Sequence, residues 1–182
     1  MARGYDGPVL DHVYLIVTGA GTARRAPELM SSLAELGPRV VAIPTPNAAR
    51  IVSNRELVLA VGPESRHRVV ESYHDEAILP RPPFGLVLVA PCSFDSLNKL
   101  AQGVADNLAL SVAAEAIGRK TPVIVAVSVN VPLWEHPRAK ESAAALRAWG
   151  VEVIDPVPEG ETITMAPNEL LVEAVRRRLA TP

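Results

Sequence analysis

The stretch "GLVLVAPCSFDSLNKLAQGVADN", residues 85–107, decides the fold. Its apolar run at 86–90 is continuous rather than alternating, which indicates a strand buried on both faces of a parallel sheet. Polar side chains and the one cysteine of the chain, Cys92, follow this run directly. Open parallel sheets bind ligands just beyond the carboxyl ends of their strands. The abrupt change from apolar to polar residues therefore predicts a binding site at the end of this strand.

Similar patterns occur on both sides of this stretch. Apolar runs of strand length lie at 13–17, 40–43, 123–127 and 151–154, and 57–62 is a further candidate strand. Helical spacing connects Ala26, Leu29, Met30 and Leu33, and again Leu97, Leu100, Ala101 and Val104. Two more helices are expected. The first runs from Pro137 to a terminal Gly150, and the second begins with Asn168 as its N-cap and has Arg176, Arg177 and Arg178 in its last turn. Alternating strands and helices predict an α/β fold with a doubly wound parallel sheet.

Length and composition exclude several classes of function. The 182 residues suit a single domain over 1–182, and the formal charge of −2 gives no electrostatic basis for binding nucleic acid or a membrane surface. No apolar run approaches the roughly 20 residues that span a bilayer. A single cysteine cannot form an internal disulfide, so a cytoplasmic location is expected, and no group of histidines has the spacing of a metal site.

The loops after the first two strands are candidates for binding a phosphate. Their candidate ligands are Gly19, Gly21 and Thr22 after the first strand, and Thr45 and Asn47 after the second. Glycines permit close approach of the backbone, and helix starts attract anions. A dinucleotide fingerprint needs a third glycine where Arg24 stands, so NAD is disfavoured. The alternative is that each loop is an ordinary capped turn.

The strand at 123–127 leads into a loop with both an amide and bulky apolar residues. Asn130 comes first, and Pro132 to Trp134 are predicted to form a pocket wall; the alternative for Asn130 is a structural turn residue. Among the histidines, His67 lies between two arginines and is expected in solvent. Judged from its local sequence alone, His74 is a surface residue.

Two motifs give these loops a common interpretation. The segment "APCSFDSLNKLAQGVADNLAL", residues 90–110, resembles the Pro-Ala-Ser-Ala-Asn-Thr and Ala-Asp-Asn-Leu motifs of the homo-oligomeric flavin-containing cysteine decarboxylases. The segment "VNVPLWEHP", residues 129–137, is similar to that family's second signature, Pro-x-Met-Asn-x-x-Met-Trp. The family includes phosphopantothenoylcysteine decarboxylases and peptidyl-cysteine decarboxylases. The likeness extends from about Asp11 to Pro156.

The resemblance implies a flavodoxin-like Rossmann three-layer sandwich that assembles as a homotrimer or a multiple of trimers, with FMN bound at a subunit interface. The implied phosphate ligands are Gly19, Gly21, Thr22, Thr45 and Asn47, and the implied ribityl and ring ligands are Ser93, Asp95 and Ser96. His74 falls at the position of the family histidine that acts at the substrate thiol. Asn130 falls at the position of the asparagine that holds the substrate carboxylate.

The implied reaction is the decarboxylation of a peptidyl or pantothenoyl cysteine. In the family, a hydride first leaves Cβ for the flavin, and the resulting thioaldehyde accepts the electrons that CO2 leaves behind. A neutral histidine that takes the thiol proton contributes about 10²- to 10⁴-fold. Pantothenoyl-type enzymes return the hydride equivalents through a cysteine in a late flap, whereas this chain has "ETITMAPN" at 161–168. We therefore expect an enethiol product.

Some residues depart from the family pattern and leave alternatives open. Val127, Val129 and Leu133 replace a proline and two methionines of the second signature, so substrate contacts are expected to differ. Cys92 and Ser93 also resemble the flavin prenyltransferases, although those enzymes carry Arg-Glu-x-Pro where this chain has "SVNVPLW". Further alternatives are a non-catalytic FMN-binding subunit and a doubly wound protein without a flavin.

Overall fold

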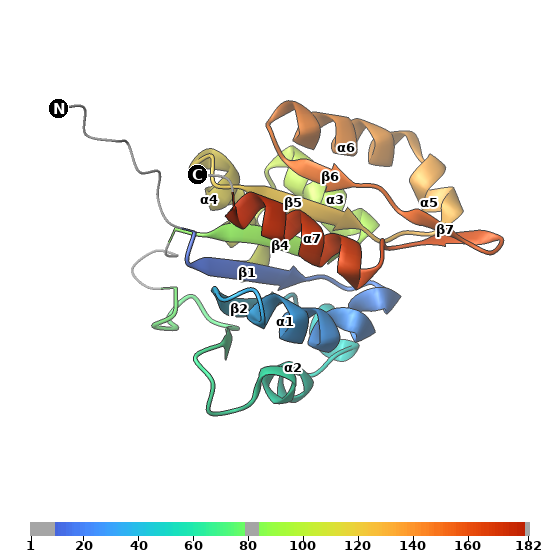
Figure 1. Cartoon of the computed structure of the whole chain (residues 1–182). Helices are drawn as coiled ribbons and strands as arrows, with labels where there is room; N and C mark the ends of the chain where they lie inside the picture. Colours follow the sequence, from blue (N-terminus) through green and yellow to red (C-terminus); the bar gives the residue numbers. More distant parts are fainter. Residues whose placement is uncertain (1–9, 79–83, 181–182) are drawn as a thin grey trace.

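The computed structural model describes residues 10–78 and 84–180, and its centre is a six-stranded sheet (Figure 1). The strand order is β3-β2-β1-β4-β5-β6, and every pairing is parallel. The strands are β1 (His12–Val17), β2 (Arg39–Pro44), β3 (Arg68–Val69), β4 (Leu86–Cys92), β5 (Val123–Val127) and β6 (Glu152–Ile154). The winding direction reverses between β1 and β4, and open α/β sheets bind their ligands at such a point.

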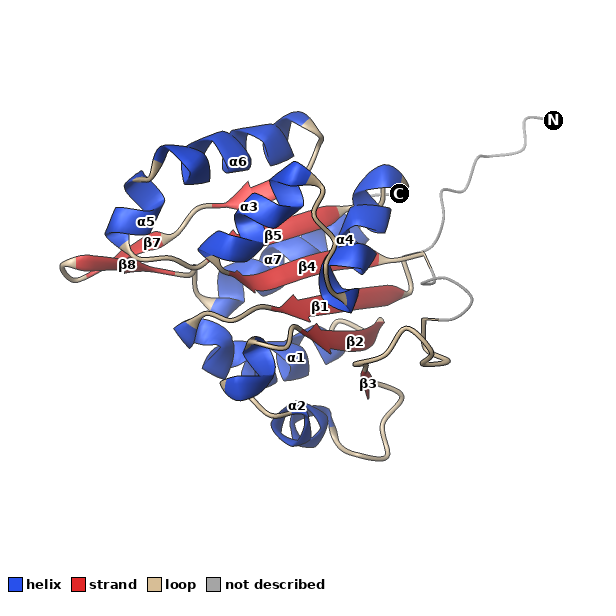
Figure 2. Cartoon of the chain, turned by 180° about the vertical axis from the view of Figure 1, so that it is seen from behind, coloured by secondary structure: helices blue, strands red, loops and turns tan. Residues whose placement is uncertain are grey.

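Helices cover both faces of the sheet and complete three layers, as Figures 1 and 2 show from opposite sides. One face packs against α1 (Ala26–Ala34), α2 (Asn54–Val61) and α7 (Asn168–Leu179). The other packs against α3 (Phe94–Gln102), α4 (Leu108–Gly118) and α6 (Pro137–Ala148), with the short α5 (Val131–Glu135) leading into α6. Alternate strand residues such as Leu15 and Ile16 enter opposite cores, which explains the continuous apolar runs. The predicted doubly wound fold is confirmed.

The predicted strand at 57–62 is wrong, because residues Asn54–Val61 form helix α2. A capping box starts this helix: the Ser53 hydroxyl accepts a hydrogen bond from the Glu56 N–H, and the Glu56 carboxylate accepts one from the Ser53 N–H. The helix ends at Gly62, whose φ of 84° lies in the left-handed region. Leu57 is its fully buried residue, so one side packs and the rest faces outward.

Two predicted helix ends also need correction. Helix α3 stops at Gln102, because Gly103 has a φ of 71°, and Val104 lies beyond it and is exposed. Pro167, not Asn168, is the N-cap residue of α7, and Asn168 is buried. The predicted start of α6 at Pro137 is confirmed, as is the turn after it at Gly150, where φ is 88°.

The sequence analysis did not predict strand β3 or the hairpin between β6 and α7. This hairpin consists of β7 (Val157–Glu159) and β8 (Thr162–Thr164), which pair antiparallel outside the main sheet. In Figure 2 it extends from the carboxyl edge of the sheet beside α5. Among the described residues, no helix combines the length and the apolar character needed to cross a membrane.

Candidate functional site

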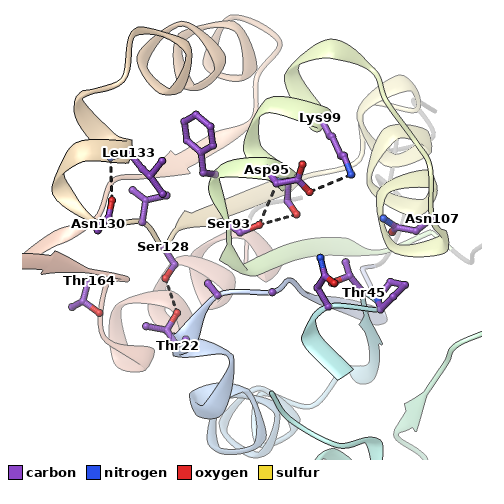
Figure 3. A pocket seen from close by; sticks show the side chains of 18 of the residues that line it. Thr22, Thr45, Ser93, Asp95, Lys99, Asn107, Ser128, Asn130, Leu133 and Thr164 are labelled. Carbon is purple, nitrogen blue, oxygen red and sulfur yellow. Dashed lines mark hydrogen bonds and ion pairs between the residues drawn. The ribbon is translucent and has the colours of Figure 1, made fainter. Parts of the chain in front are cut away.

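A pocket of about 750 Å³ lies at the carboxyl edge of the sheet, where β1, β2, β4 and β5 end (Figure 3). All eight predicted cofactor ligands line it, and so does Asn130. The eight are Gly19, Gly21, Thr22, Thr45, Asn47, Ser93, Asp95 and Ser96. The β7–β8 hairpin adds Ile163 and Thr164 on one side. The sheet therefore brings together residues that are up to 145 positions apart in the sequence (Gly19 to Thr164).

The loops after β1 and β2 touch each other, and residues of both loops line the pocket. A Cβ atom on Gly19 would lie 2.6 Å from Cβ of Asn47, so only glycine allows this approach. A Cβ on Gly21 would meet no protein atom within 4 Å, so this glycine borders open space. The short helices that follow, η1 (Gly21–Arg25) and η2 (Ala48–Arg50), have no hydrogen bond from the side chain of their N-cap residue. The Ala48 N–H at the start of η2 instead donates to Thr45 Oγ1 at 3.3 Å. The start of η1 therefore remains available to an anion.

The β4 end is fixed by a buried threonine that the sequence analysis missed. Thr18 Oγ1 donates to the Pro91 carbonyl oxygen at 2.8 Å and accepts from the Ser93 N–H at 2.8 Å. Ser93 in turn caps α3, because its Oγ accepts from the Ser96 N–H at 3.4 Å. At the end of an apolar strand, Thr18 gives no sequence signal of this role. It holds Ser93 at the pocket wall.

Cys92 does not belong to the pocket. It is fully buried in the core on the α3 side of the sheet. Burial first, and then the charge of Asp95, raises the pKa of its thiol, so the thiol stays protonated. The polar character after this strand thus comes from Ser93, Asp95 and Ser96, and the cysteine is a core residue.

Five further polar residues line the pocket and were not predicted: Ser128, Thr164, Lys99, Asp106 and Asn107. Lys99 Nζ lies 3.2 Å from Asp95 Oδ2 and 2.8 Å from Asp106 Oδ2. Hydrogen bonds to both carboxylates raise the pKa of Lys99, and the bond to Lys99 lowers the pKa of Asp106. Asn107 Oδ1 caps α4 by accepting from the Leu110 N–H. The spacing of Asp95 and Lys99 on one helix was a sequence signal for part of this network.

Asn130, at the opposite wall of the pocket, has a side-chain amide whose N–H donors can bind a ligand. Its Oδ1 accepts from the Leu133 N–H at 3.1 Å and caps α5. The Nδ2 group can therefore donate to a ligand. Next to it, the hydroxyls of Ser128 and Thr22 lie 2.6 Å apart (Figure 3).

The predicted apolar wall is only partly correct. Leu133 and Phe94 line the pocket. Trp134 instead packs against the core, and Lys140 Nζ lies 3.9 Å from the centre of its ring. Trp134 is not among the described lining residues.

The structure does not bring His74 into this pocket. His74 is exposed in a separate polar hollow with Arg39 and Arg68, and Arg39 is the first residue of β2, at the opposite edge of the sheet. The prediction that His67 is solvated is wrong. Its ring is partly buried and its Nδ1 accepts from the Val40 N–H at 3.0 Å. Burial, and then the charges of Arg66 and Arg39, lower the pKa of His67. Over residues 10–78 and 84–180, no cluster of three metal-ligating side chains is present.

The sequence pattern of the family described as Flavoprotein matches residues 9–180. The chain belongs to the Flavoprotein family. This flavoprotein is 30% identical over 149 residues to the probable phosphopantothenoylcysteine decarboxylase of Streptococcus mutans. The match covers 79% of this chain and 82% of the relative. The resemblance inferred from the two motifs is confirmed at the level of the family.

Two further comparisons bear on this flavoprotein. It is 25% identical over 174 residues to the coenzyme A biosynthesis bifunctional protein CoaBC of Thermococcus kodakarensis, covering 91% of this chain and 41% of the relative. The chain thus spans about two fifths of the length of such bifunctional relatives. The crystal structure of the FMN-dependent cysteine decarboxylase SpaF superposes with a TM-score of 0.74 at 19% identity, covering 95% of this chain and 99% of that one. This likeness supports the fold.

Proposed function

We propose that this flavoprotein is an FMN-dependent decarboxylase that acts on the carboxylate of a cysteine and releases an enethiol. The observation that carries the proposal is the pocket at the switch point of the sheet. It combines the uncapped start of η1, neutral hydroxyl groups and a free amide donor within one cavity. The relatives named phosphopantothenoylcysteine decarboxylase support the reaction class.

The lining residues fit an FMN molecule. We assign its phosphate to the loops of Gly19, Gly21, Thr22, Thr45 and Asn47, which line the pocket and where Gly21 leaves open space. We assign its ribityl chain and ring to Ser93, Asp95 and Ser96. When bound, FMN would supply an acceptor for a hydride, which carries two electrons.

Asn130 is the proposed ligand of the substrate carboxylate. Its Nδ2 group can hold the carboxylate by hydrogen bonds, while its Oδ1 remains bound to the α5 backbone. The carboxylate loses its negative charge when it leaves as CO2. An uncharged amide binds the carboxylate without a strong ion pair, which would stabilise that charge before the reaction. The reactive carboxylate is thus oriented without being overbound.

The proposed base, His74, requires a second copy of the chain. Because His74 lies outside the pocket of its own chain, we propose a homotrimer in which FMN binds at the subunit interface and a neighbour supplies His74. A neutral imidazole there would accept the substrate thiol proton. We also propose a cytoplasmic location, which the buried free thiol of Cys92 supports.

The substrate class is a peptide that ends in cysteine or a pantothenoyl cysteine. Ile163 and Thr164, the hairpin residues at the pocket, carry no thiol that could return electrons to the product. The reaction then removes CO2 and two hydrogen atoms, and an external oxidant takes the two electrons. The relatives named phosphopantothenoylcysteine decarboxylase favour this reaction over the flavin prenyltransferase alternative.

The test is to incubate purified protein with FMN and either a cysteine-terminated peptide or phosphopantothenoylcysteine, and to analyse the products by mass spectrometry. We expect loss of CO2 together with two hydrogens from one of them, and loss of turnover in Asn130→Asp. A saturated thiol in single turnover would contradict the enethiol. FMN binding without turnover of either compound would indicate a non-catalytic subunit, and failure to bind FMN would refute the proposal.

A further inference from the structure

The exit of the β7–β8 hairpin is held by a side chain from the opposite end of the sequence. Arg25, at the end of η1, donates from Nη1 to the Met165 carbonyl oxygen at 3.0 Å and from Nη2 to the Ala166 carbonyl oxygen at 2.8 Å. Its Nη2 also donates to Asn168 Oδ1 at 3.2 Å. Asn168 Nδ2 donates back to the Arg25 carbonyl oxygen at 3.3 Å. The Asn168 side chain is thus bound to Arg25, and α7 has no side-chain cap hydrogen bond at its N-cap residue, Pro167.

The two segments that Arg25 joins are both walls of the pocket. Helix η1 begins at Gly21 and Thr22, which line the pocket, and β8 ends at Thr164, which also lines it. Met165 follows Thr164 directly and is 1% exposed. The guanidinium thus fixes the distance between the cofactor loop and the hairpin strand.

An arginine is suited to this contact. Its planar group presents several N–H donors in a fixed fork, so one side chain can satisfy two successive carbonyl oxygens and an amide oxygen. Asn168 is 6% exposed, so removal of Arg25 would leave buried acceptors without a partner. Such contacts are considerably stronger than an exposed ion pair.

The hairpin has few other anchors, and one of them is the partly buried Val157 of β7, which packs against the core on the α1 side of the sheet. Its strands have three residues each, and a two-stranded hairpin of this size is marginally stable alone. Its entry is tied by the ion pair of Arg147 with Asp155, whose side chains are 44% and 50% exposed. Ile163 packs against the core, but the tip at Glu159 to Glu161 is exposed.

We propose that Arg25 and Asn168 are positioning residues that hold β8 at the pocket, so that Ile163 and Thr164 form a substrate-contacting wall. The hydrogen bonds of Arg25 with Met165, Ala166 and Asn168 form a clamp that does not depend on the reaction. The role of the wall in substrate binding, in contrast, rests on the proposed function. Neither residue lines the pocket, so both act through the hairpin.

The clamp can be tested without substrate by limited proteolysis with a glutamate-specific protease, because Glu159 and Glu161 lie at the hairpin tip. We expect Arg25→Met to increase the rate of cleavage there by about tenfold, since the exit loses its anchor. Arg24→Met is the matched control: it removes the same charge from a neighbouring exposed residue and should leave the rate unchanged. Circular dichroism and the melting temperature verify that each variant is folded.

If Arg25→Met does not fold, substitutions of Asn168, the other residue of the clamp, provide a second test of the proposal. Asn168→Leu removes both hydrogen bonds and should increase cleavage as Arg25→Met does. Asn168→Asp keeps an acceptor for Arg25 but loses the donor, so an intermediate rate is expected. Unchanged cleavage in the folded variants would overturn the proposal.

The effect on the pocket is tested by separating cofactor affinity from substrate use. In Arg25→Met we expect the Kd for FMN to stay within about threefold of wild type, while KM for the cysteine substrate rises by at least about fivefold. A fall in FMN affinity with KM unchanged would contradict a role of the hairpin in substrate binding. If the wild type binds no FMN, the proposed function fails, but the proteolysis still decides whether the clamp exists.

Discussion

At the scale of single residues, Cys92 and Ser93 show how neighbours in one motif separate into different roles. The strand sends Cys92 into the core and Ser93 toward the pocket. Thr18 fixes this division through its bonds to Pro91 and Ser93. The polar cluster of the sequence is therefore part core and part binding site.

The buried thiol predicts a loss of stability at high pH. The pKa of Cys92 is raised in the folded protein, so above about pH 9 the unfolded chain releases a proton that the folded chain keeps. The free energy of unfolding should then fall with rising pH, by at most about 1.4 kcal/mol per pH unit from this group, and this contribution is fully present at lower pH. Urea unfolding of wild type and Cys92→Ala as a function of pH measures it.

The comparison of wild type with Cys92→Ala isolates the contribution of the Cys92 thiol to the pH dependence of stability. The pKa of Tyr14 is also raised, mainly by burial, but both proteins contain that residue. We expect the variant to be less stable at neutral pH because the contacts of the sulfur atom are lost, and its curve to approach the wild-type curve as pH rises. Parallel curves would contradict the assignment.

Sequence analysis identified the site residues that directly follow strands and missed those that depend on tertiary contacts. Parallel strands place their carboxyl ends at one edge of the sheet, so the sequence could predict pocket residues that directly follow strands, such as Gly21, Thr45, Ser93 and Asn130. Asp106 lies in the connection after α3 and joins the pocket through its ion pair with Lys99, a tertiary contact that its sequence position does not predict. Thr18 and Arg25 act through partners far along the chain, which one sequence does not reveal.

At the scale of elements, the helix at 54–61 shows which signal should outweigh an apolar run. The run "LVLAVG" suggested a strand, but the preceding Ser-x-x-Glu pattern is the signature of a capping box. Since only Leu57 is fully buried, a single apolar stripe is enough for this surface element. Local capping therefore decided the structure of this segment.

The capping box predicts a measurable loss of stability. Ser53→Ala removes the acceptor of the Glu56 N–H and should lower the free energy of unfolding by about 1 kcal/mol. Hydrogen bonds from Ser53 lower the pKa of Glu56, so the part of the stabilisation that depends on the Glu56 carboxylate is present above about pH 4.5 and decreases as the pH falls through the lowered value. Ser32→Ala, within α1, is the control and should cause no such loss. Equal stability of the two variants in urea would rule out the box as a stabilising feature.

At the scale of the whole molecule, the separation of His74 from the pocket makes the proposed trimer testable. His74→Asn and Asn130→Ala should each abolish turnover, for different reasons. In mixed trimers, a site that takes its pocket from the first variant and its histidine from the second is intact. Random mixing should restore about a quarter of wild-type turnover, because a heterologous interface pairs two different patches.

The control is to mix the two purified variants without subunit exchange, which should restore no turnover. If co-expressed subunits form mixed trimers that remain inactive, His74 and Asn130 do not meet across an interface. Turnover of His74→Asn alone would move the base to another residue.

The direction of the strands also determines where the chain can be extended. The described chain enters the sheet at His12, at the start of β1, and α7 runs back until Arg178 lies with Pro122 and Val123 at the start of β5. Both ends therefore emerge at the edge away from the pocket (Figure 1). A reporter protein fused to either terminus, or attachment of either terminus to a solid support, should leave the mouth of the cavity open to solvent.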